Sequence, residues 1–515
     1  MLSIFDQGPP PPCPAPFNLA AHVLRHANGL PDKLALQVLG SDGSQDWSYA
    51  ALERAVRATG TGLLRAGLVP GQIVLMRLGN DVDFPIAYLG AIAAGLVPVP
   101  TSTQLTAPET AKIIADLAPS AVLRDPEAAC ADHPNQITLG DLRAMRYLPP
   151  CDWHMGDPDR LGYIIYTSGT SGKARAVAHA HRAIWARQMM VDGWYGLRSS
   201  DRLCHAGAFN WTYTLGTGLM DPWTIGATAL IPQPGTEISA LPSLLRRHKA
   251  TLFAAAPGVY RKMLQHHDHL NLPDLRHGLC AGEKLSRALH QAWTDASGTE
   301  MYEAFGMSEI STFISSSPTH PARGVSLGQP QVGRRVAIIG PDGADGPVPQ
   351  GDEGTIAVHR SDPGLMLGYL NAPDEAAAKM RGDWFLTGDQ GAMAIDGQIT
   401  YLGRGDDMMN AGGYRVSPLE VEAVLSHHPE IAQVGVTDIE IKPDTRIIAA
   451  FYNSPAPLDE AGLRTYVNDK LARYKQPRAY IHLPVLPTGA NGKLLRRALP
   501  AYFKAPQHDR PDHNA

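Results

Sequence analysis

The sequence predicts an α/β protein with a large N-terminal body of helix-flanked sheets, a β-rich subdomain and a small α+β C-terminal domain. From about residue 19 to residue 231, helical patterns alternate with short apolar runs, which is typical of helices layered on largely parallel sheets. After Gly324 the apolar runs become shorter and are bounded by Gly and Pro, as in residues 354–360. This change indicates a smaller and mostly antiparallel subdomain. A fresh α+β pattern follows residues 401–416.

Short apolar runs mark the expected strands of the body. They are separated by helical patterns and lie at residues 72–78, 120–125, 161–167 and 251–257. Runs of this length, flanked by turn residues, are typical of buried strands. The regular alternation of strands and helices therefore predicts a sheet that helices cover.

The C-terminal domain is expected to begin where charges and glycines cluster, near residue 405. Ser417, Pro418 and Glu420 have the residue types of a capping box with Pro at the first helical position, so they predict a helix that begins there. We therefore expect two domains, which are residues 1–404, with the β-rich subdomain at about 325–404, and residues 405–515.

Composition excludes several classes of protein. The chain has 515 residues, with 45 Lys and Arg against 50 Asp and Glu, a formal net charge of −5. This balance disfavours a nucleic-acid binder that works by neutralising phosphates. A chain with 44% hydrophobic and 18% charged residues is also neither disordered nor fibrous.

Cysteine usage and the N-terminus predict a cytoplasmic protein. The five cysteines are scattered and never spaced as CxxC, so they indicate reduced thiols and not a disulfide framework or zinc site. The first residues contain Asp6 and a proline tract where a signal peptide needs a positive flank and an apolar core. The longest apolar stretch, residues 84–100, is interrupted by Pro and Gly, and we expect no membrane span.

The segment YTSGTSGK at residues 166–173 predicts a phosphate-binding loop. Two glycines let backbone N–H groups turn toward an anion, hydroxyls add donors, and Lys173 adds a charge. The segment differs from a P-loop because its glycine spacing is shorter and Ala174 replaces the hydroxyl residue that would bind magnesium. A serine-rich turn without a ligand is the alternative interpretation.

Other segments accompany this loop in a fixed order. They are YEAFGMSEIS (302–311), WFLTGDQG (384–391), YLGRGDDMMNAGGYRVSPLEVE (401–422) and PTGANGK (487–493). In order and spacing this set resembles the acyl-CoA synthetase and adenylate-forming ligase superfamily. GLCAGE and MSEISTFISS are most similar to the benzoate and medium-chain acyl-CoA ligases.

The resemblance implies an ATP-dependent carboxylic acid:CoA ligase. A carboxylate resists attack because it is negatively charged, so the family first joins the acid to ATP as an acyl-adenylate with release of pyrophosphate. A thiol then displaces AMP. The first step depends on stabilising the charge around the phosphates, and the implied cofactors are ATP, Mg²⁺ and coenzyme A.

The resemblance also assigns nucleotide-binding residues. Glu309 would hold the magnesium ion, which prefers oxygen ligands, and Ser308 would contact the α-phosphate. Phe305 would cover the adenine and Glu303 would lie near its amino group, although an aromatic residue here could equally be core. The remaining nucleotide contacts implied are Ser168, Gly169, Thr170, Ser171, Gly172, Lys173, Gly282, Glu283, Lys284, Ala304, Gly306 and Met307.

Further residues are implied for ribose and catalysis. Asp389 has two carboxylate oxygens for the two ribose hydroxyls, and Arg404 would contact the ribose as well. Arg415 would lie near the phosphates. Lys493 would bridge the attacking carboxylate and the α-phosphate, and Thr167 is the third catalytic residue with Glu309 and Lys493.

The family alternates between two conformations, because the lysine must leave before the thiol can attack. The resemblance implies a mobile C-terminal domain with its hinge at Asp406. Gly412 and Gly413 would line the coenzyme A channel, where the absence of a side chain permits close approach; a tight turn before a helix is the alternative. The basic residues 473–475 could contact coenzyme A phosphates or simply end a helix.

The acid pocket is expected within residues 204–231. Phe209, Asn210, Trp211 and Tyr213 favour an apolar acid, either an aryl acid or a medium-chain fatty acid, although such aromatics are often core. A carrier-protein-loading adenylation enzyme for an acid or amino acid is one alternative function, and a catalytically inactive nucleotide sensor is another. We expect no nucleic-acid partner, and a homodimer is possible.

Overall fold

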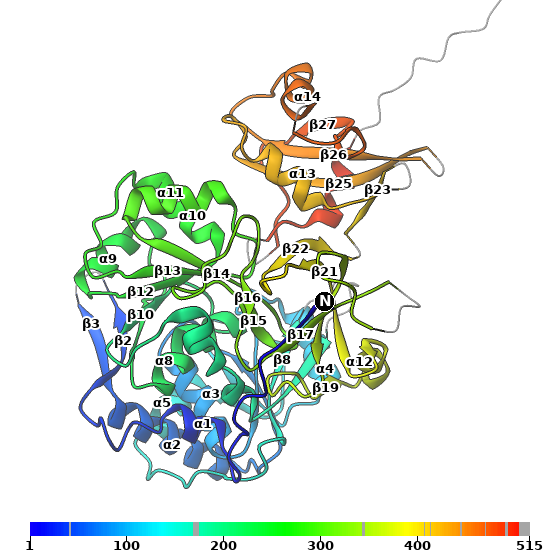
Figure 1. Cartoon of the computed structure of the whole chain (residues 1–515). Coiled ribbons are helices and arrows are strands. Elements are labelled where there is room, and N and C mark those ends of the chain that lie inside the picture. The colour runs from blue at the N-terminus through cyan, green and yellow to red at the C-terminus, as the bar shows by residue number, and fades with distance from the viewer. Residues whose placement is uncertain are drawn as a thin grey trace, which may run out of the picture. The chain divides into compact units, whose positions relative to one another are not determined.

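The computed structural model describes residues 1–40, 43–167, 175–341, 346–405, 407–411, 414–442, 445–468, 470–489 and 493–503 (Figure 1). The chain divides into two compact units. The first comprises residues 1–352, 357–387 and 393–400, and the second comprises residues 353–356, 388–392 and 401–515.

The main sheet of the first unit is largely parallel. Its strand order is β16 (Gln329–Pro330), β15 (Ser311–Ser315), β14 (Glu300–Met307), β13 (His277–Ala281), β12 (Leu252–Ala255), β10 (Arg202–His205), β11 (Thr228–Pro232), β2 (Leu34–Leu39) and β3 (Ser44–Ser48). Strands β14 to β2 in this order run parallel, and the edge strands β16, β15 and β3 are antiparallel. This arrangement confirms the predicted α/β class.

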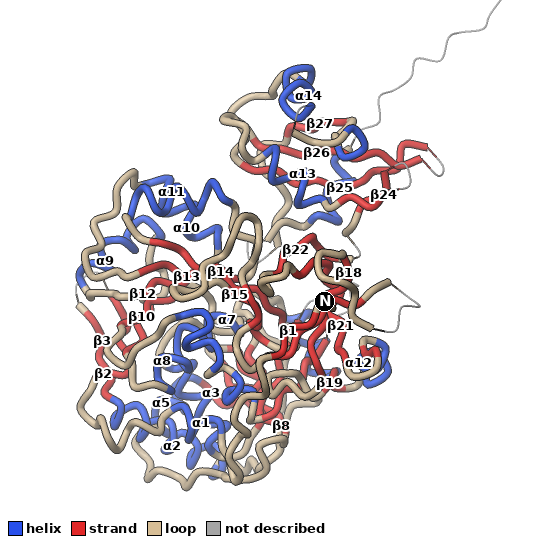
Figure 2. The backbone as a smooth tube through the Cα atoms, viewed as in Figure 1, coloured by secondary structure: helices blue, strands red, loops and turns tan. Residues whose placement is uncertain are grey.

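Helices cover this sheet because its strands are apolar on both faces. In β12, Phe253 packs with helices α9 (Leu241–Arg247), α10 (Pro257–His266) and α11 (Arg287–Ser297). Its neighbour Leu252 packs on the opposite face with Trp194 of the π-helical turn η1 (Val191–Tyr195). Successive side chains of a strand point to opposite faces, so a continuous apolar run requires partners on both faces. Figure 2 shows helices on both sides of these strands.

The first unit also contains two smaller sheets. A parallel sheet has the order β5 (Val97–Pro100), β4 (Ile73–Arg77), β6 (Ala121–Arg124) and β7 (Gln136–Thr138). An antiparallel sheet has the order β19 (Gly368–Leu370), β9 (Arg175–Ala180) and β8 (Leu161–Thr167). The expected strands at 72–78, 120–125, 161–167 and 251–257 are β4, β6, β8 and β12.

The β-rich part of the chain forms a further sheet. Its strand order is β1 (Ile4–Asp6), β17 (Arg335–Ile339), β18 (Glu353–His359), β21 (Trp384–Met393) and β20 (Met380–Arg381), and β22 (Ile399–Arg404) also pairs with β21. Most of these strands follow Gly324, as the sequence predicts.

The remaining helical elements of the first unit are short to medium in length. They are α1 (Leu19–Val23), α2 (Tyr49–Arg65), α3 (Asp83–Ala93), α4 (Ala107–Leu117), α5 (Leu139–Met145), α6 (Ala183–Ala186), α7 (Thr212–Leu215), η2 (Gly216–Met220), α8 (Asp221–Thr224), η3 (Ile238–Ala240) and α12 (Pro373–Ala378). The apolar stretch 84–100 forms most of α3 and then β5. No helix in the described part of the chain is long and apolar enough to cross a bilayer.

The second unit has its own α+β core. Strand β25 (Gln433–Lys442) pairs antiparallel with β26 (Thr445–Asn453), which pairs parallel with β27 (Ala479–His482). Its other elements are β23 (Met409–Ala411), β24 (Tyr414–Val416), α13 (Pro418–Leu425), α14 (Glu460–Asn468), η4 (Arg473–Lys475) and η5 (Arg496–Tyr502). Val421 and Leu425 of α13 pack on Val436 and Ile448 of the sheet.

The start of α13 corrects one detail of the sequence analysis. The helix begins at Pro418, as predicted, but the Ser417 side chain makes no capping hydrogen bond. Its hydroxyl instead donates to the carbonyl of Leu402, and Glu420 accepts from Lys475 at 2.5 Å. The predicted capping box was therefore wrong, because tertiary partners of Ser417 and Glu420 replaced the local ones.

Candidate active site

The predicted phosphate loop joins β8 to β9. Thr167 ends β8 and pairs with Arg175, the first residue of β9. The predicted residues of the loop itself lie outside the described residues; they are Ser168, Gly169, Thr170, Ser171, Gly172 and Lys173. Arg175, which the sequence analysis did not single out, forms a two-point ion pair with Glu375, with both N···O distances at 2.6 Å.

A tight turn between β14 and β15 carries Ser308 and Glu309. The two strands pair in an antiparallel register that shifts between Phe305 and Gly306. A Cβ atom at Gly306 would lie 2.2 Å from the carbonyl oxygen of Ser311, so only glycine fits. Ser311 has a φ of +71°, a strained value for a residue with a side chain. We call residues 306–311 the Glu309 turn.

The Glu309 carboxylate lies among polar groups that the sequence analysis missed. Its Oε1 accepts from the hydroxyl of Tyr369 at 2.6 Å and lies 4.0 Å from Nζ of Lys379. Its backbone carbonyl accepts from the N–H of Met366 at 2.8 Å. Burial, and then the neighbouring carboxylate, raise the pKa of the Tyr369 hydroxyl, so Tyr369 is a neutral donor to Glu309.

The chemistry of Glu309 fits a magnesium ion that arrives with a nucleotide. Its side chain is 14% exposed and offers hard oxygen ligands. Among the residues that the structure describes, no group of three or more His, Cys, Asp or Glu is placed to hold a metal ion. Magnesium is commonly held by one or two carboxylates together with substrate phosphates, so a single glutamate suits it.

The residues predicted to contact adenine lie on β14 and on the loop that follows β13. The buried Glu303 accepts from the backbone N–H of Leu285 at 2.8 Å, which ties β14 to the loop of Gly282, Glu283 and Lys284. Burial raises the pKa of Glu303 to about 7, and the charge of Lys284 opposes this rise. Ala304 is buried.

Phe305 and Met307 lie near the end of β14, where the strand approaches the Glu309 turn. Phe305 is half-buried and packs edge-on against Phe313, with ring centroids 5.5 Å apart. The partly exposed ring is compatible with the adenine contact that the sequence analysis assigned to it, and that role stays a prediction.

The four residues predicted for the acid pocket divide into two pairs. Phe209 and Tyr213 are buried, and the Tyr213 hydroxyl donates to the carbonyl of Leu279 at 3.1 Å. Asn210 and Trp211 are half-buried. The Trp211 ring lies where a Cβ of Gly282 would be, at 2.5 Å. Trp211 packs edge-on against Tyr213, with ring centroids 5.4 Å apart, and the substrate contacts of both residues stay predictions.

In the second unit, Asp389 and Arg404 come together as the sequence analysis expects. Asp389 is buried, its Oδ2 lies 3.7 Å from Arg404 Nη1, and its Oδ1 accepts from the Tyr401 hydroxyl at 3.2 Å. Burial, and then Asp389, raise the pKa of Tyr401, so this tyrosine stays a donor. Tyr401 is the first residue of the motif at residues 401–422, but the sequence analysis assigned it no role.

Several predicted residues of the second unit are only partly described. Lys493 is exposed, and its carbonyl accepts from the N–H of Gly489 at 2.7 Å. The predicted hinge Asp406 and the channel residues Gly412 and Gly413 lie outside the described residues, and the side chain of Arg415 does too.

Comparisons with known proteins identify the family. Residues 23–370 match the AMP-binding enzyme family, and residues 420–493 match the AMP-binding enzyme C-terminal domain. The chain is 31% identical over 487 residues to a 4-hydroxybenzoate–CoA/benzoate–CoA ligase of Rhodopseudomonas palustris, which covers 89% of each chain. It is 28% identical over 505 residues to a 3-hydroxybenzoate–CoA ligase of an Aromatoleum strain, over 93% of this chain and 95% of that protein.

A solved structure shows the same architecture. The chain superimposes on a benzoate CoA ligase from Burkholderia xenovorans LB400 with a TM-score of 0.82 at 25% identity, over 94% of this chain and 99% of that one. The sequence matches and this likeness confirm the predicted resemblance. The chain therefore belongs to the AMP-binding enzyme family.

Proposed function

We propose that the protein is an ATP-dependent carboxylic acid:CoA ligase that acts on an apolar aryl or medium-chain acid. The observation that carries the proposal is the Glu309 turn, which presents a single carboxylate beside a tyrosine donor within a chain of the AMP-binding enzyme family. The benzoate and hydroxybenzoate ligases among its relatives support the choice of acid.

The first half-reaction joins the acid to the α-phosphorus of ATP. A carboxylate oxygen forms the new O–P bond, and the bond to the departing pyrophosphate breaks. A magnesium ion, when bound, offsets phosphate charge. Glu309 would hold it, Tyr369 would orient that carboxylate, and Lys493 would hold the attacking carboxylate against the α-phosphate.

Asp389 is proposed to accept hydrogen bonds from the ribose hydroxyls. Tyr401 donates to its Oδ1 and Arg404 lies 3.7 Å from its Oδ2, and these contacts fix the orientation of the carboxylate. A carboxylate that is held in place before the ligand arrives loses less freedom on binding.

The second half-reaction replaces AMP by the thiol of coenzyme A. The sulfur forms a bond to the acyl carbon, the bond from that carbon to the AMP oxygen breaks, and the thiol proton is released. We propose that residues 405–515 form a domain that moves about Asp406 relative to residues 1–404 between these steps, with Gly412 and Gly413 beside the thiol. The separate family matches to residues 23–370 and 420–493 support a division between these parts.

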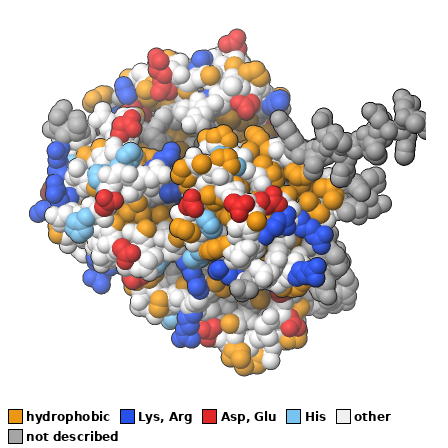
Figure 3. Space-filling view, turned by 90° about the horizontal axis from the view of Figure 1, so that it is seen from above, with side chains coloured by type: hydrophobic (Ala, Val, Ile, Leu, Met, Phe, Trp, Pro, Cys, Tyr) orange, Lys and Arg blue, Asp and Glu red, His pale blue; other side chains and the backbone are white. Residues whose placement is uncertain are grey.

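A cytoplasmic location and a homodimer are also proposed. All five cysteines are free thiols, as is usual in a reducing compartment. On the face shown in Figure 3, basic and acidic side chains are both scattered, which does not favour a nucleic-acid partner.

The test is a pyrophosphate-release assay over aryl, medium-chain and amino acids, with and without coenzyme A. We expect acid-dependent release of pyrophosphate and AMP, and an acyl-CoA product only when coenzyme A is present. Formation of ADP, or ATP binding without turnover of any acid, would contradict the proposal. Turnover that never yields a thioester with coenzyme A would point to a carrier protein as the acceptor.

A further inference from the structure

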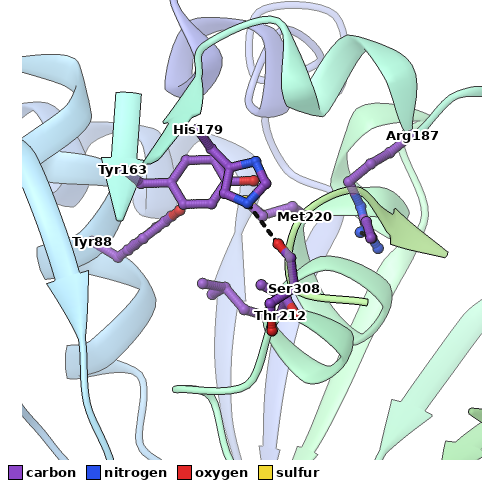
Figure 4. Close-up of a pocket in the computed structure, with 9 residues that line it drawn as sticks. Tyr88, Tyr163, His179, Arg187, Thr212, Met220 and Ser308 are labelled. Carbon is purple, nitrogen blue, oxygen red and sulfur yellow. Dashed lines mark hydrogen bonds between the residues drawn. The ribbon is translucent and has the colours of Figure 1, made fainter. Parts of the chain in front are cut away.

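A small cavity lies in the first unit behind the Glu309 turn. It measures about 20 Å³ and is lined by residues of α3, β8, β9, α7, η2 and the turn itself, and by Arg187, which follows α6 (Figure 4). The residues from α7 and η2 lie within the segment 204–231, where the acid pocket is expected. A cavity of this size holds about one water molecule. None of these side chains except that of Ser308 belongs to the proposed nucleotide contacts.

Two buried polar atoms on the cavity wall have no hydrogen-bond partner among the described residues. They are the hydroxyl of Tyr88 and Nδ1 of His179, whose residues are 0% and 2% exposed. A buried polar group without a partner destabilises the folded protein, because it loses its hydrogen bonds to water. Such groups in native proteins are commonly paired by an ordered water.

The other nitrogen of His179 holds the turn. His179 Nε2 lies 2.7 Å from the backbone carbonyl oxygen of Ser308 (Figure 4). A carbonyl oxygen can only accept, so Nε2 carries the proton and Nδ1 is the acceptor of this neutral ring. The ring stacks on Tyr163 at a centroid distance of 4.8 Å and an interplanar angle of 13°, which fixes its plane.

The far end of the turn is anchored from the same cavity. Arg187 donates to the hydroxyl of Ser311, the residue with the left-handed φ of +71°. Arg187 is itself held by Asp221, with Nη2 and Oδ2 2.6 Å apart. A strained backbone conformation persists only where surrounding contacts hold it in place. His179 supplies such a contact at the carbonyl of Ser308, in the peptide group that joins Ser308 to Glu309.

We propose that His179 is a positioning residue for the Glu309 turn, and that the cavity lined by His179 and Tyr88 holds one ordered water that completes the hydrogen bonding of His179. His179 would act through the Ser308 carbonyl, without touching the substrate. This inference rests on the proposed function, because it gives the turn its role in magnesium and ATP binding. Burial lowers the pKa of His179 to about 4, so the ring is neutral near pH 7 and its Nδ1 can accept a hydrogen bond from a water.

Substitution of His179 tests the positioning role. In His179→Leu the donor to Ser308 is lost. We expect kcat/KM for MgATP in pyrophosphate exchange, and the MgATP affinity by calorimetry, to fall about 10- to 100-fold, with the KM of the acid changed by less than about twofold. His179→Gln should recover most of the loss, because its amide N–H₂ can reach the same carbonyl. His179→Asn should not recover the loss, because its side chain is shorter. This variant replaces His179→Leu if the leucine variant fails to fold.

His277→Leu is the matched control. His277 is also a buried histidine on a strand whose Nε2 contacts a backbone carbonyl, that of Tyr195 at 2.8 Å, but it lies at the opposite end of the main sheet strands from the turn. It should lose thermal stability without a change in MgATP affinity. Equal loss of affinity in His277→Leu, or failure of His179→Gln to recover, overturns the positioning role. If the wild-type protein adenylates no acid, the proposed function is contradicted and not the role of His179. The MgATP affinities of the variants, measured by calorimetry, still test that role.

The Tyr88→Phe variant tests the water. If a water bridges the two atoms, removing the hydroxyl leaves the water and His179 with one partner fewer, and the Tm should fall. If the hydroxyl is truly unpaired, its removal should raise the Tm, and that result overturns the water. A crystal structure of the wild-type protein should show density for one water in this cavity.

Discussion

Glu309 illustrates how one residue depends on neighbours that are distant in the sequence. Its carboxylate meets Tyr369, 60 positions away, and its carbonyl meets Met366. The motif GMSE identifies the glutamate, but the contacts that orient it come from the segment before α12. The role of Glu309 can be tested directly.

Substitution Glu309→Gln is expected to lower the rate of adenylation about 100-fold or more, since the charged oxygen ligand for magnesium is lost. Raising the magnesium concentration should recover part of the rate. The measurement is acid-dependent pyrophosphate exchange against magnesium concentration. Glu300→Gln, on the exposed start of the same strand, is the control and should behave as wild type; an unchanged Glu309→Gln enzyme would remove the residue from the site.

Glu303 is expected to make stability depend on pH. Its pKa is raised from 4.5 to about 7 in the folded protein, mainly by burial. The folded state therefore holds this proton more tightly than the unfolded state. The resulting stabilisation is fully present below pH 4.5 and is lost as pH rises through 7.

The variant Glu303→Gln lacks this titration but keeps an oxygen to accept from Leu285. The free energy of unfolding of both proteins is measured by denaturant titration at pH 5, 6, 7 and 8. As pH rises, the wild type should lose stability relative to the variant. A difference that is constant over this range contradicts the raised pKa.

At the scale of single elements, the Glu309 turn is the part of the site with the tightest backbone. Gly306 faces the backbone of Ser311 and Thr312. The backbone of these two residues cannot move away from Gly306 without separating β15 from β14. The substitution Gly306→Ala is expected to destabilise the protein by about 1–3 kcal/mol or more and to impair adenylation.

Gly258→Ala provides the matched control for that substitution. Gly258 lies in the first turn of α10, and a Cβ there would meet nothing within 4 Å. Alanine is favoured over glycine in a helix, so this variant should keep or gain stability. Thermal denaturation of both variants compares the two sites, and equal Tm values would contradict the close approach at Gly306.

The sequence predicted most elements correctly where the local residue pattern matches the burial of the segment in the folded protein. The run at 251–257 became β12 because a strand buried on both faces is apolar throughout. The capping box at Ser417 failed because Leu402 and Lys475 offered partners that lie outside the local sequence. Tyr369, Tyr401 and His179 were missed for the same reason, since a lone aromatic residue carries no local signal of the carboxylate or carbonyl that it meets.

At the scale of the whole molecule, the two half-reactions are expected to depend on different residues. Lys493→Ala should abolish acid-dependent ATP–pyrophosphate exchange but leave thioester formation from a supplied acyl-adenylate largely intact, because the lysine is needed only where the phosphorus is attacked. The two assays are run on the same preparation. Lys470→Ala, another exposed lysine of the second unit, should leave both unchanged, and equal loss of both activities in Lys493→Ala would contradict the assigned role.

The sequence by itself determined the family, the order of the motifs and the identity of the groups that carry charge, because these depend on residue types at fixed spacings. The tertiary structure alone decided which neutral groups contact the site: Tyr369 at the Glu309 carboxylate, Tyr401 at the Asp389 carboxylate and His179 at the backbone carbonyl of Ser308. Hydrogen bonds act over about 3 Å, and only the folded chain brings residues so far apart in sequence within that distance.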